Sequence, residues 1–426
     1  MRTRSFFFPA LLLVFALSLS SQGQTGTEIT LYTFTGGADG STPQSGLAFG
    51  PTGSLFGDTY FGATTNNTYC ETGCGTVFQL TPGSGGGPWT FETLHTFAGG
   101  ASDYGHPTFR PAFDAAGNLW GTAFEWGPGG FGGVFELLAA SNWSESLIYN
   151  FSSSTGVQPS AGLTAYNGSW YGTTQFGRGF VNNGQVFSLS PASGGQWNEN
   201  VVHAFSAGAD GYEPQTELLF DQKGNIYGST PYGGPSGSGD IFTLSPVAGG
   251  KWKETVIYNF PFYNLGFSFY PSTLIFDPQG NLYGTTGFGG TGTCDVVLGC
   301  GTLFELQRVG NSWQETTLYE FLGGTDGEVP TGGLLLDSHG NLYGITLYGG
   351  TGSCTSGQLS GCGTVFQLSK TNGAWQKSTV YNFTGIGDGA FPIGTLVSDS
   401  AGNLYGVTEG YPGSVSQYGT VFEIVP

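Results

Sequence analysis

Three short motifs recur seven times along this chain of 426 residues, and few folds can accommodate such a repeat. The first motif is an apolar segment that ends in Phe, as in Ile257–Phe260. The second contains an aromatic residue followed by Gly, as in Gly280–Thr286, and the third is Gly-Thr-Val-Phe or a close variant. Successive copies of a motif lie 51 to 64 residues apart. A period of this length, with several short strands in each repeat, predicts the blades of a β-propeller.

Seven copies of each motif predict seven blades. The first motif ends at Phe34, Phe97, Phe151, Phe205, Phe260, Phe321 and Phe383. The Gly of the second motif is Gly57, Gly121, Gly172, Gly228, Gly284, Gly344 and Gly406. The third motif ends at Phe78, Phe135, Phe187, Phe242, Phe304, Phe366 and Phe422.

One repeat predicts four antiparallel strands, from the innermost to the outermost of a blade. In the fourth copy these strands are Leu218–Asp221, Ile226–Thr230, Ile241–Ser245 and Lys251–Phe260. The turn between the first two contains Asp221 and Gly224, since Asp can hydrogen-bond the backbone of its own turn and Gly can take a positive φ. We expect stacked blades to bury both faces of their strands, so polar and apolar residues need not alternate.

The two ends of the repeat region predict how the propeller closes. The chain after residue 24 begins with a strand of the outermost type, Glu28–Phe34, and ends with a strand of the third type, Gly419–Ile424. The N-terminal strand should therefore complete the last blade. This pairing removes open sheet edges, which promote aggregation.

The composition agrees with an all-β protein. The chain has 78 Gly, 15% aromatic residues and only 9% charged residues. Few Lys, Glu and Ala with many Thr, Tyr, Phe and Val favour strands and turns over helices. The many aromatic side chains argue against disorder, because disordered chains carry little apolar surface.

The N-terminus predicts a signal peptide over residues 1–24, followed by the propeller domain over residues 25–426. Arg2 and Arg4 precede the apolar run Phe6–Leu19, which is short for a membrane span. Removal of this segment leaves 8 Lys and Arg against 29 Asp and Glu, a net charge of about −21. Such a charge repels nucleic acid and anionic membranes. We expect a secreted or periplasmic bacterial monomer without a membrane span.

The six cysteines form three local pairs: Cys70 with Cys74, Cys294 with Cys300, and Cys354 with Cys362. The second cysteine of each pair directly precedes the third motif. The same placement in three repeats predicts three local disulfides, which suit export to an oxidising compartment. A zinc site would need four converging ligands, and no His lies near any pair in the sequence.

The units Gly-Asn-Leu-Tyr-Gly-Thr-Thr (Gly280–Thr286), Gly-Thr-Val-Phe and Gly-Gly-x-Asp-Gly resemble the GloVer tandem repeat of bacterial extracellular proteins. The resemblance extends over residues 28–426. It implies no activity, and the chain departs from the family's choice-of-anchor pattern because it ends at Val425–Pro426 without an anchor segment. A looser similarity to Kelch-type propellers supports the architecture alone.

Five of the loops that join an outermost strand to the next innermost strand contain Asp-x-x-x-Pro. Their aspartates are Asp39, Asp103, Asp210, Asp326 and Asp388. These loops share one face, here called the top face, with the loops between second and third strands. A ring of carboxylates could bind Ca²⁺, which prefers several oxygen ligands. Alternatively, each Asp caps its own turn.

The four histidines are scattered through the sequence. His95 and His203 occupy a position that is Tyr in the other copies, which predicts packed aromatic rings. His339 lies in a turn, and His106 lies between Asp103 and Pro107 on the predicted top face. Scattered histidines disfavour a copper or zinc enzyme, and His106 is kept as a candidate ligand-binding residue.

Three longer loops, Thr64–Gly73, Thr291–Gly299 and Thr351–Gly361, contain the predicted disulfides. Exposed aromatic residues in or beside them suit carbohydrate or peptide binding. The candidates are Tyr60, Tyr69, Phe288 and Tyr348. The leading hypothesis is a non-catalytic protein that binds an extracellular glycan or protein. The alternatives are a cation-dependent hydrolase or lyase that acts on polysaccharide, and a structural envelope component.

Overall fold

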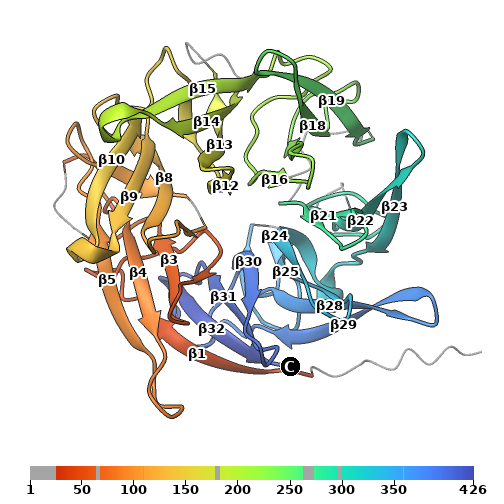
Figure 1. Ribbon diagram of the computed structural model, residues 1–426. Coiled ribbons are helices and arrows are strands. Elements are labelled where there is room, and N and C mark those ends of the chain that lie inside the picture. The colour runs from red at the N-terminus through yellow and green to blue at the C-terminus, as the bar shows by residue number, and fades with distance from the viewer. Residues whose placement is uncertain are drawn as a thin grey trace, which may run out of the picture.

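The computed structural model describes residues 25–63, 68–108, 110–177, 183–261, 273–294, 299–357 and 359–426. These residues form seven antiparallel sheets arranged around a central axis (Figure 1). The prediction of an all-β, seven-bladed propeller is confirmed. The predicted signal peptide lies outside the described residues. Within the described ranges, no helix has the length and apolar character needed to cross a bilayer.

The first three blades have their strands in the predicted meander order. The first blade contains β2 (Ala48–Phe49), β3 (Leu55–Thr59), β4 (Thr76–Thr81) and β5 (Thr90–Thr96). The second contains β6 (Tyr104–Pro107), β7 (Ala112–Phe113), β8 (Leu119–Trp126), β9 (Gly133–Leu138) and β10 (Ser144–Asn150). The third contains β11 (Val157–Pro159), β12 (Thr164–Tyr166), β13 (Ser169–Phe176), β14 (Gln185–Pro191) and β15 (Trp197–Ala204). Two short strands share the innermost position in the second and third blades.

The remaining blades follow the same order. The fourth contains β16 (Leu219–Phe220), β17 (Ile226–Thr230), β18 (Asp240–Val247) and β19 (Lys251–Asn259). The fifth contains β20 (Ile275–Phe276), β21 (Leu282–Thr286), β22 (Thr302–Val309) and β23 (Ser312–Glu320). The sixth contains β24 (Glu328–Leu336), β25 (Leu342–Tyr348), β28 (Thr364–Thr371) and β29 (Ala374–Asn382). The seventh contains β30 (Pro392–Ser398), β31 (Leu404–Thr408), β32 (Thr420–Val425) and β1 (Thr27–Thr33).

Few elements lie outside the blades. A small hairpin is formed by β26 (Thr355–Ser356) and β27 (Leu359–Ser360). Three short 3-10 turns are η1 (Ala139–Ser141), η3 (Ser193–Gly195) and η4 (Gly324–Asp326).

The N-terminal strand completes the seventh blade, as predicted. β1 pairs antiparallel with β32, with Thr27 opposite Val425 and Thr33 opposite Thr420. The N–H of Phe34 then donates to the carbonyl of Gly419 at 3.0 Å. The first and last described segments therefore lie side by side at the rim (Figure 1).

The three sequence motifs meet at every contact between neighbouring blades. In the first blade, Gly57 of the second motif lies opposite Phe78 of the third. A Cβ on Gly57 would come within 2.5 Å of the Phe78 ring, so the Gly makes room for that ring. Phe34, which follows β1 of the seventh blade, packs edge to face on Phe78 with ring centroids 5.3 Å apart. All seven contacts repeat this Phe–Phe pair at 5.1 to 5.6 Å.

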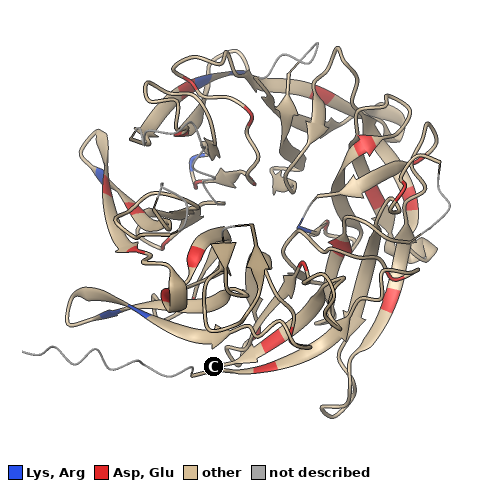
Figure 2. Ribbon diagram, turned by 180° about the vertical axis from the view of Figure 1, so that it is seen from behind, with Lys and Arg blue, Asp and Glu red and all other residues tan. Residues whose placement is uncertain are grey.

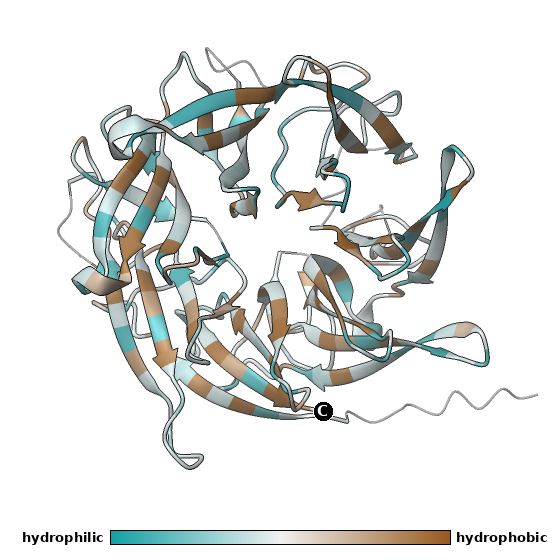
Figure 3. Ribbon diagram, in the orientation of Figure 1, coloured by the Kyte–Doolittle hydropathy of each residue, from teal (hydrophilic) through white to brown (hydrophobic). Residues whose placement is uncertain are grey.

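Burial differs between the inner and outer strands. The second strand of the fourth blade, β17, is buried at all five positions, as expected for a strand with blades on both sides. The outermost strand β19 alternates between exposed and partly buried residues over its first six positions. The rim faces solvent, so the expected burial of both faces holds for the central strands and not for the outermost ones. Figure 3 shows hydrophilic and hydrophobic residues interspersed along the outer strands.

The predicted Asp–Gly turns between the first two strands of a blade are present. Asp221 Oδ1 accepts hydrogen bonds from the N–H groups of Lys223 and Asn225 at 2.8 and 2.9 Å. The side-chain amide of Asn225 donates to Asp221 Oδ2 at 2.7 Å. Four more copies share this arrangement, at Asp114, Asp277, Asp337 and Asp399. The turn at Asp337 places His339 in solvent, as predicted.

Candidate ligand site at the mouth of the central channel

A cavity of about 380 Å³ lies at the centre of the top face, where the blades converge. Residues from all seven blades line it, and we call this cavity the mouth. The side chains that give the mouth its polar character belong to Gln44, Tyr60, Arg110, Gln175, Gln215 and Glu217. A cavity of this size lies within the range of small-molecule sites.

An ion pair crosses the mouth between the second and fourth blades. Arg110 Nη2 donates to Glu217 Oε2 at 2.9 Å, and Nε donates to Oε1 at 3.3 Å. The pair passes over Gly162 of the third blade, where a Cβ would lie 2.6 Å from Glu217 Oε1. The charge of Glu217 raises the pKa of Arg110 above its ordinary value. The Arg110 side chain keeps 42% of its surface exposed, so its guanidinium still faces the cavity.

Sequence reasoning missed this ion pair, although the repeat contains a signal for it. Arg110 and Glu217 occupy one position of the repeat, directly before a buried residue (Pro111 and Leu218) that precedes the innermost strand. The other five blades have small residues at this position: Gly46, Gly162, Thr273, Gly333 and Thr395. Two opposite charges at a position that is otherwise Gly or Thr indicate a role specific to this chain's channel.

Of the predicted ligand-binding residues, Tyr60 lines the mouth, and His106 packs against its ring. The rings of Tyr60 and His106 stack with centroids 4.6 Å apart and an angle of 12°. His106 Nδ1 lies 3.3 Å from Glu125 Oε2, and this hydrogen bond lowers the pKa of Glu125. Burial raises the pKa of Tyr60, so its hydroxyl stays protonated at neutral pH. The aromatic pair and the carboxylate thus form one hydrogen-bonded and stacked unit.

The backbone at His106 adopts a conformation that the repeat imposes. His106 has a φ of +56° and precedes Pro107, and its N–H donates to the carbonyl of Cys74 at 2.8 Å. Five other described residues in front of the equivalent prolines also have positive φ: Thr42, Gln158, Glu213, Val329 and Phe391. Because six blades share this strained conformation, we attribute it to the fold. His106 differs from the other five residues only in its side chain.

The other predicted ligand-binding residues lie elsewhere. Tyr69 is half exposed and packs edge to face on Trp126 at 5.4 Å. Phe288 packs against the core between the fourth and fifth blades. Tyr348 contacts Phe391 at 5.3 Å. None of these three described residues lines the mouth.

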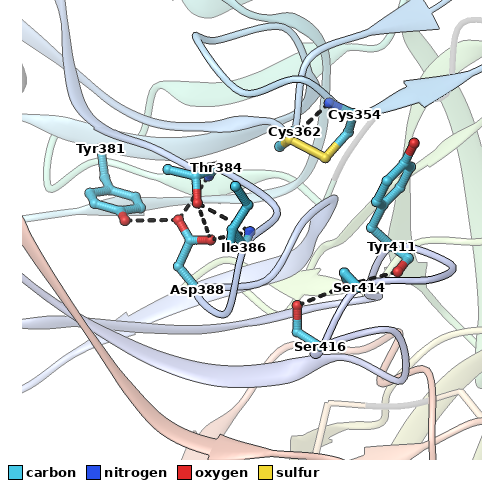
Figure 4. Close-up of a disulfide and its surroundings, with 9 residues drawn as sticks. All are labelled: Cys354, Cys362, Tyr381, Thr384, Ile386, Asp388, Tyr411, Ser414 and Ser416. Atoms are coloured by element: carbon cyan, nitrogen blue, oxygen red, sulfur yellow. Dashed lines mark hydrogen bonds between the residues drawn. A yellow bond between two sulfur atoms is a disulfide. The ribbon is translucent and has the colours of Figure 1, made fainter.

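The aspartates of the Asp-x-x-x-Pro loops accept hydrogen bonds from their own loops, and three of them also accept one from a Tyr of the preceding outermost strand. Asp388 Oδ2 accepts from the Tyr381 hydroxyl at 2.9 Å and from the Thr384 N–H at 2.8 Å, and Oδ1 accepts from the Thr384 hydroxyl at 2.7 Å (Figure 4). Asp39 repeats these three contacts with Tyr32 and Thr35. Asp103, Asp210 and Asp326 also accept backbone N–H bonds from their own loops.

The proline of the same motif packs against the preceding blade. A Cβ on Gly75, at the start of the third motif, would lie 2.7 Å from Pro107 Cδ. The same close approach joins Gly363 to Pro392. No two of the five aspartates share a group of potential metal ligands within 4.8 Å among the described residues. These contacts support the turn-capping role, and Ca²⁺ binding stays a prediction.

The three predicted disulfides are present: Cys70–Cys74, Cys294–Cys300 and Cys354–Cys362. Figure 4 shows the last of these beside the Asp388 loop. All three long loops that contain these cysteines include residues outside the described ranges. Three disulfides suit a protein that resides outside the reducing cytosol.

The channel below the mouth is apolar. A second cavity of about 660 Å³ begins at Arg110 and Glu217, and its wall includes Leu219, Ile275 and Val397. Figure 3 shows hydrophobic residues on the innermost strands. The ion pair therefore lies where the polar and apolar halves of the channel meet.

Charge is sparse and mostly negative over the rest of the molecule. Figure 2 shows acidic positions distributed over the blades, with few basic ones. A basic surface for nucleic acid is not expected from this distribution.

Comparisons with known proteins agree with the fold. The family described as "Gloeobacter/Verrucomicrobia repeat" matches residues 63–267 and 218–426. A search of curated proteins found no match. The fold is similar to that of a fungal alcohol oxidase of the AA5 family, solved with copper, with a TM-score of 0.58 and 12% identity over 94% of this chain and 76% of that one. It also matches the periplasmic gluconolactonase PpgL of Pseudomonas aeruginosa, with a TM-score of 0.48 and 14% identity over 82% of this chain and 92% of that one. The similarity to the alcohol oxidase supports the fold alone.

Proposed function

This chain belongs to the Gloeobacter/Verrucomicrobia repeat family, and we propose that it is an exported protein that binds a neutral glycan at the mouth of its propeller. The observation that carries the proposal is the stacked Tyr60–His106 pair beside a polar cavity. The leading hypothesis from the sequence located the binding of an extracellular glycan or protein in the top-face loops. The proposal moves the site inward, to the centre of that face.

The chemistry of the mouth matches that of a sugar ring. A pyranose has apolar C–H faces and hydroxyl groups around its edge. The Tyr60 ring supplies an aromatic surface, and the amides of Gln44, Gln175 and Gln215 supply both donors and acceptors. The volume of about 380 Å³ is at the small end of the range for ligand pockets, which suits a terminal sugar unit rather than a long chain.

The ion pair favours a neutral ligand. Glu217 already engages two guanidinium nitrogens of Arg110, so the pair adds little net charge to the mouth. The net charge of the whole chain is −19, which disfavours the approach of an anionic glycan. The remaining lone pairs and N–H groups of the two side chains can still bind hydroxyl groups.

Replacement of Tyr60 tests this proposal. We expect Tyr60→Ala to weaken binding to the best ligand from a glycan array by about 10-fold or more, because loss of a buried aromatic contact costs on the order of 1–2 kcal/mol. Isothermal titration with the purified glycan provides the measurement. Tyr69→Ala is the matched control, since it removes an exposed Tyr that does not line the mouth.

An equal loss of affinity in Tyr69→Ala would contradict the proposal, because binding would then involve the disulfide loop. One observation favours the alternative of a structural envelope component. The Asp and Pro of the Asp-x-x-x-Pro motif stabilise their own loops and the contacts between blades. This alternative predicts that wild-type protein binds no glycan and that Tyr60→Ala alters stability alone.

A further inference from the structure

Neighbouring blades contact one another near the top face through three recurring side chains. One is the aromatic residue of an outermost strand, and the second is the Asp of the loop that follows it. The third lies two residues after the Trp of the next outermost strand. Between the fifth and sixth blades these residues are Tyr319, Asp326 and Lys377. There the Tyr hydroxyl and the ammonium group both donate to Asp326, at 2.8 and 2.9 Å.

The contact between the first and second blades has a different composition at the same three positions. His95 replaces the Tyr, Asp103 is retained, and Glu145 of β10 replaces the Lys. His95 Nε2 lies 3.9 Å from Asp103 Oδ1 and 3.9 Å from Glu145 Oε1. These separations are too long for hydrogen bonds. The three side chains are only 12–18% exposed, and they come from two blades.

Two atoms of this cluster are buried and lack a hydrogen-bond partner. They are His95 Nε2 and Glu145 Oε1, which both face the interior of the cluster. Buried polar atoms normally have partners, because an unsatisfied group costs on the order of 1–3 kcal/mol. Two carboxylates that approach one another must share a proton or bind a cation. Among the described residues, no Lys or Arg bridges this cluster, in contrast to Lys377 at the equivalent contact.

We infer that His95, Asp103 and Glu145 bind one divalent zinc-type cation between the first and second blades. The three ligand atoms all lie within 4.8 Å of one another. Ligand atoms that bind one zinc ion at about 2.0–2.2 Å lie roughly 3–4 Å apart. One imidazole and two carboxylates form a ligand set that zinc accepts, and three protein ligands leave a coordination position for water. Asp103 Oδ1 also accepts the Tyr104 N–H at 2.7 Å, which orients the carboxylate.

Two other clusters of potential metal ligands differ from this one in ways that argue against zinc binding. His203, Asp210 and Glu254 occupy the same positions at the contact between the third and fourth blades, but their ligand atoms do not form a group within 4.8 Å. The proposal is therefore one ion for each chain. The other described group of three, Cys294, Cys300 and Glu328, has both its sulfurs in a disulfide and offers no thiolate.

Zinc titration of the purified protein tests the inference. Isothermal titration with ZnCl₂ in phosphate-free buffer should give one ion per chain, and bound Co²⁺ should give visible absorption typical of nitrogen and oxygen ligands. His95→Tyr introduces the residue that five other blade contacts have, so we expect a folded protein with at least about 10-fold weaker zinc affinity. His203→Tyr is the matched control and should keep the wild-type affinity and stoichiometry.

Zinc should also raise the unfolding temperature of the wild type and of His203→Tyr, and not that of His95→Tyr. The inference is overturned if wild-type protein binds no zinc, since the cluster would then hold only protons. It is equally overturned if His95→Tyr keeps the wild-type affinity, or if both variants lose affinity to the same extent.

Discussion

At the scale of single residues, the repeat accounts for the residue type at most positions. The residues that depart from the repeat need a separate explanation. Gly57 and its equivalents make room for a Phe ring. Arg110 and Glu217 replace small residues at one position, and His95 replaces a Tyr at another. Arg110 and Glu217 introduce charges at a position that the other blades fill with neutral side chains, and His95 introduces an imidazole where five other blade contacts have Tyr.

Glu409 gives a prediction at this scale. Burial raises the pKa of Glu409 to about 6 from 4.5. The folded state therefore holds this proton more tightly than the unfolded chain, so stability falls as the pH rises from about 4.5 to 6 and stays lower above that range. Glu409→Gln should remove this fall and stabilise the protein at pH 7 by about 2 kcal/mol at most.

Chemical denaturation at pH 4, 5 and 7 measures this effect. Glu71→Gln, at an exposed position, serves as the control. A stability difference between Glu409→Gln and wild type that does not depend on pH would contradict the assignment.

At the scale of elements, the loops between blades combine two functions. Asp organises the loop through hydrogen bonds, and Pro packs on the Gly of the preceding blade. The residue before the Pro takes a positive φ because its N–H bonds to that preceding blade. Each loop therefore connects two blades through side chain and backbone together.

The Asp388 loop distinguishes turn capping from calcium binding. Asp388→Asn keeps the shape of the side chain but removes the charge that accepts the N–H and O–H bonds. We expect a loss of about 1–3 kcal/mol in the free energy of unfolding. The loss should be the same in EDTA and in CaCl₂, as measured by thermal and chemical unfolding. A rise in the melting temperature of wild type with Ca²⁺, and none in Asp388→Asn, would establish the calcium hypothesis instead.

At the scale of the whole molecule, stability depends on closure of the ring. β1 covers the edge of β32, and Phe34 supplies the seventh Phe–Phe contact. The first and last parts of the chain are thus held in one sheet. An open propeller would expose a strand edge and an apolar blade face at the same time.

Removal of residues 25–34 tests closure. The shortened protein should self-associate and melt at a lower temperature, because the edge of β32 becomes available to other chains. Size-exclusion chromatography and thermal unfolding measure both effects. A synthetic peptide of residues 25–35, added in trans, should restore part of the stability. A monomer with unchanged melting temperature would show that closure contributes little.

The repeat motifs and the cysteine spacing were enough to predict the architecture, the closure and the disulfides. Seven copies of three motifs specify strands and turns locally, and the same Phe–Phe contact recurs between all neighbouring blades. The cysteine pairs are separated by 4, 6 and 8 residues, so their partners are also local. The sequence was also enough to place the five aspartates in loops. It could not show whether their carboxylates accept hydrogen bonds or bind a metal ion.

Which distant residues meet depends on how the blades pack around the channel. Arg110 and Glu217 are 107 residues apart, and they pair because two nonadjacent blades face one channel. His95 was predicted to be a packed aromatic ring, and it does pack on Phe97 at 4.6 Å, but its Nε2 also faces Glu145 of the next blade. Tyr60 meets His106 across the first blade contact in the same way. Such contacts depend on the rotation between blades, which a repeat pattern does not encode residue by residue.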